Sequence, residues 1–175
     1  MIDDYSVPEG RLRGFSMSLP MSLLRAREAA MQHFRPMLRS HGMTEQQWRV
    51  MRALASKRTV EFPELVDMTF LLAPSMSRIL KELENRKLIV RQTTHEDARK
   101  INVAITAAGL RLIEKVAPHS EFVYGQISSR YGAKKLATLQ AMLRDLEDAL
   151  SGELIEQSPA NESKRPSRRL RTGSR

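Results

Sequence analysis

The first half of the chain carries apolar residues at the spacing of amphipathic helices. Residues 19–41 hold one such stripe, which consists of Leu23, Ala30, Met31, Phe34, Met37 and Leu38. Pro36 lies inside this predicted helix and is expected to kink it, because the proline ring removes the hydrogen bond to the Gln32 carbonyl. A second helix is predicted to begin at Thr44, which forms a T-x-x-Q capping box with Gln47.

Shorter elements follow in the middle of the chain. The pattern predicts a short helix around residues 62–68 and another over residues 74–87, each with a proline in its first turn, where proline is tolerated. Two strand-like runs come next, over residues 88–93 and 100–106, and the second alternates apolar and polar positions. The six polar residues between them, 94–99, are expected to form the tip of a β-hairpin.

Two long helical patterns, over residues 107–130 and 133–150, follow the hairpin, and the first is expected to break at Pro118. The sequence therefore predicts a mainly α fold with a small β-hairpin, in which a winged helix-turn-helix domain adjoins a layer of long helices. The expected organisation is a flexible segment over 1–18, an N-terminal helix over 19–43, the winged domain over 44–106, C-terminal helices over 107–150 and a disordered basic tail over 151–175.

Composition and charge narrow the possible functions. The 175 residues are 41% hydrophobic and 28% charged, which suits one compact domain or one domain plus an extension. The net charge of +9 favours a polyanionic partner, but residues 159–175 hold six basic residues against one glutamate and carry +5 of it. The absence of cysteine excludes disulfides, thiolate zinc sites and cysteine nucleophiles. No apolar run reaches the ~18 residues of a membrane span, and no signal-peptide pattern opens the chain, so a cytoplasmic protein without a membrane partner is expected.

The predicted fourth helix has two contrasting faces. Its apolar face consists of Met76, Ile79, Leu80 and Leu83. The candidate DNA contacts lie on the opposite face and its flanks and are Pro74, Ser75, Ser77, Arg78 and Lys81. Small hydroxyls near a helix N-terminus, followed by Arg and Lys one turn apart, suit a helix in a major groove, where arginine can be bidentate to guanine. The alternative is an ordinary amphipathic helix with a solvated basic face.

The hairpin adds a second candidate DNA contact. Arg99 and Lys100 lie where the predicted tip meets the second strand, and a hairpin can insert an arginine into the negative potential of a minor groove. Asp97 is placed to pair with a cation and to hold the shape of the loop. The alternative is a polar turn with charges for solubility. A groove-type helix followed directly by such a hairpin favours DNA binding.

Two segments resemble a known family. HEDARKINVAITAAG, residues 95–109, is similar to the wing signature of MarR-family winged helix-turn-helix regulators, with Asp97, Arg99 and Val103 at its D-x-R and Val positions. LLRAREAAMQHFRPMLRSHGMTEQQWRVMRAL, residues 23–54, resembles the homoprotocatechuate-operon (HpaR-type) branch, which responds to aromatic acids. The likeness extends over residues 19–150. Lys87 stands where the family has a glycine before the first wing strand, and the tail after Pro159 falls outside the pattern.

The resemblance implies a homodimer that binds a pseudo-palindromic operator in double-stranded DNA. By this likeness, residues 19–41 and 107–150 form the dimer layer, and their long apolar stripes are compatible with it. Packing within one chain is the alternative. Two-fold symmetry would place the two Arg78–Lys81 faces about one DNA turn apart, roughly 34 Å.

A charge within the first apolar stripe suggests a ligand. Arg27 is expected to be buried there and to need a partner, and the second helix adds Arg49 and Arg52 beside Trp48. Such arginines repel one another unless an anion intervenes, and a small aromatic carboxylate would place its ring against the aromatic residues. The candidate effector contacts are Arg27, His33, Phe34, Gln47, Trp48, Arg49 and Arg52, with His41 as a further donor to a phenolic hydroxyl. Alternatively, Arg27 pairs with Glu28, Glu45 or a partner subunit, or reaches water.

The expected function is a repressor of an aromatic-compound catabolic operon that a small aromatic acid releases from its operator. No enzymatic activity, cofactor or metal is expected, since the four histidines lack metal-ligand spacing and no catalytic motif is present. A ligand-independent or architectural DNA-binding protein is the alternative. The sequence leaves open whether the effector is a free phenolic acid or a coenzyme-A thioester, which arginine binds it, and whether the regulator represses or activates.

Overall fold

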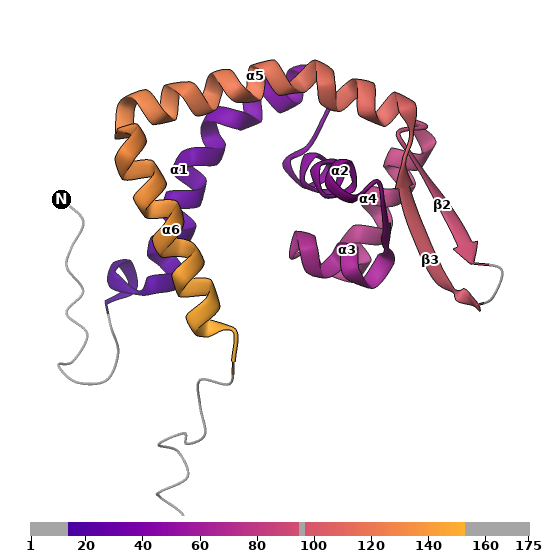
Figure 1. Cartoon of the computed structure of the whole chain (residues 1–175), viewed down its shortest axis with the longest axis horizontal. Helices are drawn as coiled ribbons and strands as arrows, with labels where there is room; N and C mark the ends of the chain where they lie inside the picture. The colour runs from indigo at the N-terminus through magenta and orange to yellow at the C-terminus, as the bar shows by residue number, and fades with distance from the viewer. Residues whose placement is uncertain (1–13, 95–96, 153–175) are drawn as a thin grey trace, which may run out of the picture. The chain divides into compact units, whose positions relative to one another are not determined.

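The computed structural model describes residues 14–94 and 97–152, and the chain divides into two units, Met1–Arg130 and Tyr131–Arg175. The first unit holds a 3-10 helix, five α-helices and three strands in its described residues (Figure 1). These elements are η1 (Phe15–Met17), α1 (Leu19–Ser40), α2 (Glu45–Lys57), β1 (Thr59–Glu61), α3 (Phe62–Thr69), α4 (Ala73–Asn85), β2 (Ile89–Thr94), β3 (Asp97–Ile105) and α5 (Ala107–Tyr131), whose last residue belongs to the second unit.

The start of α2 is fixed by its side chains, as predicted. The Gln47 backbone N–H donates to Thr44 Oγ1 at 3.1 Å, and the Thr44 N–H donates to Gln47 Oε1 at 3.0 Å. This reciprocal pair satisfies two of the donors that a helix N-terminus leaves free. The capping box is confirmed, and it positions the face of α2 that carries Trp48.

The predicted break of α5 at Pro118 is wrong, because the helix runs through this residue without interruption. Proline removes one backbone hydrogen bond, but the bonds on both sides remain. Val116 and Ser120 are buried on either side of Pro118, so packing holds the backbone in helical geometry across it. The helix α1 likewise continues through Pro36, between the buried residues Phe34 and Leu38.

The sheet has one strand more than the predicted hairpin. Its order is β1-β3-β2, and both pairs are antiparallel. The short β1 places Val60 opposite Val103, and both side chains are buried. Strand β3 begins at Asp97, so the expected tip over residues 94–99 is too long, and an irregularity in pairing falls between Thr93 and Thr94.

The turn between α4 and β2 explains how a lysine replaces the family's glycine. Lys87 adopts a φ of 57°, in the left-handed region that favours glycine. The Leu88 N–H donates to the Leu83 carbonyl at 3.0 Å, and the Lys87 N–H donates to the Glu84 carbonyl at 2.8 Å. This is the Schellman pattern of helix termination. The turn therefore keeps its geometry and carries the strain of a side chain at a positive φ.

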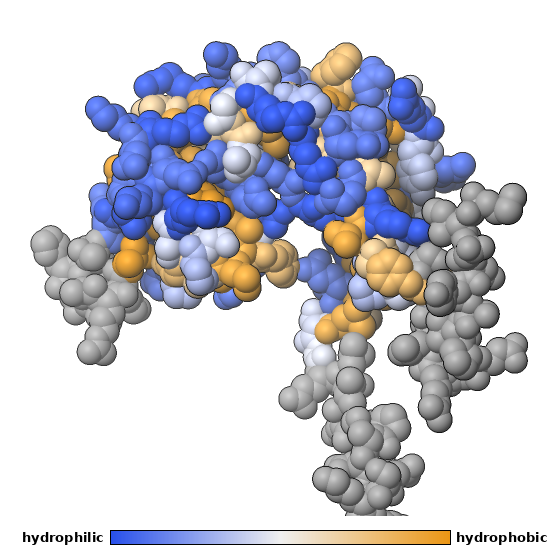
Figure 2. All heavy atoms as spheres, turned by 180° about the vertical axis from the view of Figure 1, so that it is seen from behind, coloured by the Kyte–Doolittle hydropathy of each residue, from blue (hydrophilic) through white to orange (hydrophobic). Residues whose placement is uncertain are grey.

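One hydrophobic core joins these elements. Its buried members include Phe34 and Leu38 of α1, Met51 and Leu54 of α2, Leu65 of α3, Met76, Ile79, Leu80 and Leu83 of α4, Val103 of β3 and Val116 of α5. The predicted apolar face of α4 is confirmed by the burial of all four of its residues. Seen from behind, the surface along the top of the view, where α5 and the end of α1 lie, is mainly hydrophilic (Figure 2).

The second unit contains α6 (Ala133–Leu150), which begins after Gly132 at a φ of 96°. Its larger apolar side chains Leu139, Met142, Leu143 and Leu150 are exposed. Across residues 14–94 and 97–152, no helix has the length and apolar character needed to cross a membrane.

Candidate DNA-binding surface and ligand cavity

The burial of one face of α4 directs its opposite face to solvent. Pro74, Ser77, Arg78 and Lys81 are exposed, whereas Ser75 is half-buried. Ser77 Oγ donates to the Ala73 carbonyl at 3.0 Å, so its hydroxyl proton is already engaged within the helix. Arg78 and Lys81 make no ion pair within the part of the chain that the structure describes. Their charges are therefore available to a polyanion.

The wing is anchored to α4 by an ion pair that the sequence patterns did not indicate. Arg91 on β2 donates from Nε to Glu84 Oε2 at 2.9 Å, and its Nη2 pairs with the same carboxylate. The hydrogen bond from Arg91 lowers the pKa of Glu84, and the same bond raises the pKa of Arg91. Seven residues separate the two, across a turn between a helix and a strand, where helical spacing gives no signal.

The predicted wing contacts lie at the edge of what the structure describes. Asp97, Arg99 and Lys100 belong to β3, which with β2 extends away from the helices in Figure 1. Asp97 pairs with Thr94 of β2, but the side chains of all three residues, together with residues 95–96, lie outside the described part. Their roles stay predictions.

A cavity of about 560 Å³ opens among α1, α2, α5 and the turn that follows α3. It is lined by Arg27, Met31, Phe34, Glu45, Trp48, Arg49, Arg52, Phe70, Ser120 and Tyr124. The volume falls within the range of sites for small organic ligands, about 300–1,000 Å³. Helical spacing had grouped the α1 and α2 members, and the structure shows that they meet across one cavity.

Five of the lining residues were not predicted as effector contacts: Met31, Glu45, Phe70, Ser120 and Tyr124. Ser120 and Tyr124 lie one turn apart on α5, and Phe70 follows the last residue of α3. Glu45 was expected only as a partner of Arg27. The i, i+4 spacing of two hydroxyl-bearing residues on α5 is the signal that could have found Ser120 and Tyr124.

Glu45 holds the basic residues of the cavity together. Arg35 donates to Glu45 Oε2 from Nε at 3.2 Å and from Nη2 at 3.1 Å, and Arg49 Nη2 lies 3.2 Å from Glu45 Oε1. Arg27 pairs with Glu45 and, at 2.6 Å, with Glu28. The expected burial of Arg27 is wrong, because its side chain is 40% exposed at the edge of the cavity and pairs with both glutamates.

The cluster nevertheless keeps excess positive charge. Four arginines, 27, 35, 49 and 52, face two glutamates, 28 and 45, which leaves two positive charges unbalanced. The hydrogen bond from Arg35, with further contributions from the charges of Arg35 and Arg27, holds the pKa of Glu28 below its ordinary value. Burial, and the nearby charge of Arg27, lower the pKa of Arg49. The lowered pKa of Arg49 reflects the cost of burying a cation beside a like charge.

Aromatic rings form the other walls of the cavity. Phe34 and Tyr124 meet edge to face, with ring centroids 5.0 Å apart. The Arg52 guanidinium lies 5.9 Å from the centroid of the Trp48 ring, a cation–π distance. The arrangement offers flat apolar walls beside a positive edge, with the Tyr124 and Ser120 hydroxyls as polar groups.

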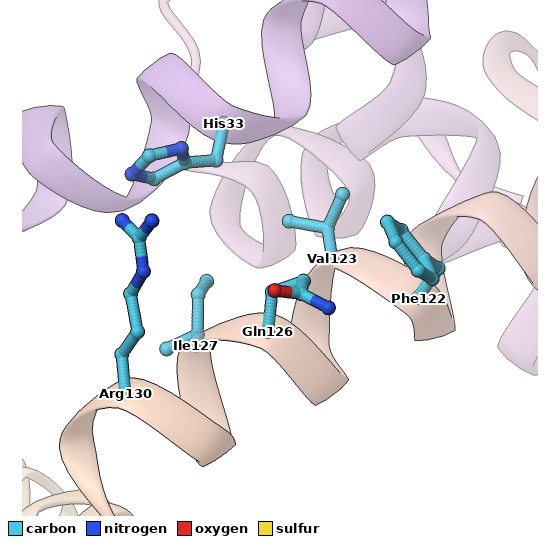
Figure 3. Close-up of a pocket in the computed structure, with 6 residues that line it drawn as sticks. All are labelled: His33, Phe122, Val123, Gln126, Ile127 and Arg130. Carbon is cyan, nitrogen blue, oxygen red and sulfur yellow. The ribbon is translucent and has the colours of Figure 1, made fainter.

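Three of the candidate effector residues lie elsewhere. The amide of Gln47 is buried, and its Nε2 donates to Glu82 Oε2 on α4 at 2.7 Å. His33 lines a separate cavity of about 260 Å³, where it faces Arg130 of α5 near Ile127, with Phe122 at the other end of the cavity (Figure 3). The ring of His41 lies 5.1 Å from that of His119. Within the described residues, no group of three or more His, Asp or Glu side chains could hold a metal ion.

Comparisons with known proteins agree with this geometry. The family model described as "MarR family" matches residues 41–100. The chain is 37% identical over 128 residues to the homoprotocatechuate degradative operon repressor of Escherichia coli, a match that covers 73% of this chain and 86% of that one. It is 36% identical over 137 residues to the HTH-type transcriptional regulator FarR of Neisseria gonorrhoeae, covering 77% and 94% of the two chains.

Solved structures give the same result. The transcriptional regulator PA4135 superposes with a TM-score of 0.73 at 39% identity, over 75% of this chain and 96% of that one. NadR in complex with 4-hydroxyphenylacetate superposes with a TM-score of 0.67 at 34% identity, over 78% of this chain and 97% of the other. These matches extend beyond the winged domain to the surrounding helices.

Proposed function

Because this chain belongs to the MarR family of DNA-binding transcriptional regulators, we propose that it represses an operon for aromatic-compound catabolism and that a small aromatic carboxylic acid releases it. Action on a chromosomal operator would take place in the cytoplasm. The observation that carries the proposal is the cavity of about 560 Å³, in which an excess of arginine adjoins Trp48, Phe34 and Tyr124.

The DNA-binding half of the proposal rests on α4. Its exposed Arg78 and Lys81 lie on the face opposite the core, and Pro74 lies in its first turn. A pair of such helices, related by the two-fold axis of a homodimer, would enter successive major grooves of a pseudo-palindromic operator. The wing residues Arg99 and Lys100 would contact the flanking minor groove, with Asp97 shaping the loop.

The ligand half rests on charge and shape. A carboxylate would bind the arginines, and its ring would pack between Trp48 and Phe34. The Tyr124 hydroxyl would bond a ring substituent. The relatives support an aromatic acid, since one is named for a homoprotocatechuate operon and another was crystallised with 4-hydroxyphenylacetate. The ligand can shift operator affinity only through its different affinity for the DNA-bound and free shapes of the dimer.

A titration of operator binding tests both halves. An operator selected from random duplex DNA is labelled, and its affinity is measured with 4-hydroxyphenylacetate, homoprotocatechuate, vanillate and hydroxycinnamates. At least one acid should weaken binding by about 5- to 150-fold, the usual range of allosteric coupling. The uncharged amide of the same compound should have little effect. The double variant R78A/K81A should lose selective binding, whereas K115A, an exposed change on α5, should retain it.

The ion pairs favour one alternative function. Arg27, Arg35 and Arg49 already have Glu28 and Glu45 as acceptors, so a ligand-independent DNA-binding protein is compatible with this site. Selective operator binding that no aromatic acid alters would support that alternative and would contradict the effector proposal.

A further inference from the structure

One guanidinium of the cavity wall reaches the helix-turn-helix directly. Arg49 lies on α2, and its Nη2 is 3.2 Å from Glu45 Oε1 at the cavity. Its Nη1 donates to the backbone carbonyl of Thr69 at 2.9 Å. Thr69 is the last residue of α3 and is fully buried. The same side chain therefore joins the charged cluster of the cavity to the end of the first helix of the DNA-reading pair.

The contacted carbonyl sits where the chain turns toward α4. A helix C-terminus leaves carbonyl groups without helical partners, and Arg49 satisfies the one at Thr69. The next residue, Phe70, adopts a left-handed conformation at φ 52° and itself lines the cavity. The turn leads from the end of α3 to the start of α4 at Ala73. Arg49 bonds to its first carbonyl, at Thr69, and Phe70 within it lines the cavity.

No other residue that lines this cavity makes a side-chain hydrogen bond or ion pair to α3 within the described part of the chain. Arg27 bonds to Glu28 and Glu45, and Arg52 lies over Trp48 of its own helix. Burial and the charge of Arg27 lower the pKa of Arg49. The Arg49 cation is therefore stabilised chiefly by its two acceptors, Glu45 and the Thr69 carbonyl. An entering anion would compete for it.

We propose that Arg49 couples the cavity to the helix-turn-helix, because a carboxylate that binds both terminal nitrogens of Arg49 takes it from Glu45 and from the Thr69 carbonyl. The proposal rests on the proposed function and specifies how it operates. A carboxylate and a guanidinium form two parallel bonds through the terminal nitrogens that now serve those two acceptors, and turning the guanidinium toward the ligand to form them breaks its bonds to Glu45 and Thr69. The end of α3 then loses its partner, and the turn to α4 is free to change.

The variant R49K separates coupling from charge. Lysine keeps the positive charge for a ligand, but a single ammonium cannot bridge the two acceptors in the way of a guanidinium. The matched control is R52K, since Arg52 also lines the cavity but does not contact α3. For each protein, calorimetry gives the affinity for 4-hydroxyphenylacetate, and anisotropy gives the operator affinity without and with saturating acid.

We expect the acid to weaken operator binding of the wild-type protein by tenfold or more, and that of R49K by less than about twofold at saturation. R52K should bind the acid more weakly but should retain the wild-type effect once saturated. If wild type and R49K respond equally, Arg49 is not the coupling residue, although the proposed function stands. If wild type responds to none of the acids tested, both the proposed function and this inference fail.

Hydrogen exchange provides a second test that does not depend on the folding of a variant. In the wild-type protein, the acid should increase amide exchange at residues 69–73, because the end of α3 loses its side-chain partner. Exchange in the interior of α2 should remain unchanged, as an internal reference. Operator release with unaltered exchange at residues 69–73 would overturn the inference.

Discussion

Gly109, in the first turn of α5, is a residue where the fold leaves no room for a side chain. A Cβ atom there would lie 2.3 Å from the Leu88 carbonyl oxygen and 2.7 Å from Ile105 Cγ1. Backbone cannot move aside cheaply, so we expect G109A to lower the free energy of unfolding by about 1–3 kcal/mol, as overpacked cores do. Urea denaturation monitored by circular dichroism measures the change.

The same helix supplies the control for this experiment. A Cβ at Gly125 would meet nothing within 4 Å. G125A should therefore be neutral, or should stabilise by about 0.5–1 kcal/mol, because alanine has the better helix propensity. Equal losses of stability in G109A and G125A would show that contact with the Leu88 carbonyl is not the cause.

Glu45 is the residue whose loss should disturb the cavity most. Its side chain is only 13% exposed and accepts from Arg27, Arg35 and Arg49. E45Q leaves three cations around a neutral amide, which should lower the free energy of unfolding. Because the arginines are partly exposed and water screens their charges, we expect a loss of only about 1–2 kcal/mol. E114Q, an exposed change on α5, is the control. An aromatic acid should raise the melting temperature of E45Q more than that of wild type, and an unaltered stability would contradict the bridging role.

The sequence could identify site residues only within single helices. Helical spacing placed Phe34 near Arg27 and placed Arg52 near Trp48, because side chains one or two turns apart share a face. It could not reveal contacts between elements. Gln47 was a candidate ligand donor, but its amide bonds to Glu82, which is 35 residues away. Such a pairing depends on how α2 packs against α4, which local periodicity does not contain.

At the scale of elements, the link between α4 and the wing should depend on pH. The bond from Arg91 lowers the pKa of Glu84 below its ordinary value of 4.5. A lowered pKa in the folded state adds stability that is fully present above pH 4.5 and is lost as the pH falls through the lowered value. The E84Q/R91Q double-mutant cycle should give a coupling of about 0.2–1 kcal/mol at pH 7, because the pair is exposed.

Measured by urea unfolding, this coupling should disappear once the pH has fallen below the lowered pKa of Glu84, because the carboxyl is then protonated. A coupling that stays constant between pH 7 and that range would contradict a contribution from the charged pair. The K57Q/E64Q cycle, across the exposed pair that joins α2 and α3, serves as a comparison.

Most helices and strands could be predicted from the sequence, and the errors at β1 and at Pro118 each have a physical cause. The four helices from α1 to α4 and the two wing strands follow from spacing, capping and prolines. The strand β1 has three residues, too few for alternation to show, and it exists because Val60 pairs with Val103 far along the chain. The helix α5 passes through Pro118 because buried neighbours on both sides outweigh the lost hydrogen bond.

At the scale of the whole molecule, two groups of basic residues are expected to contribute differently to DNA affinity and to operator selectivity. Residues 159–175 hold six basic residues and one glutamate, and they lie outside the described part of the chain. Arg78 and Lys81, by contrast, occupy a fixed face of α4. Phosphate contacts supply affinity that falls with salt, whereas base contacts supply selectivity. The tail and α4 should therefore contribute differently to operator binding.

Deletion of residues 159–175 tests this division. If the tail contacts phosphates, the slope of log affinity against log salt should become shallower by about 0.9 for each contact removed, while the preference for operator over random DNA persists. R78A should have the opposite effect. It should reduce the preference for operator over random DNA, and it should change the slope of log affinity against log salt by no more than about 0.9, the value for one contact. Affinities measured from 50 to 300 mM salt give both quantities. Complete loss of selective binding on deletion would instead identify the tail as the principal DNA-binding element and would leave α4 a supporting role.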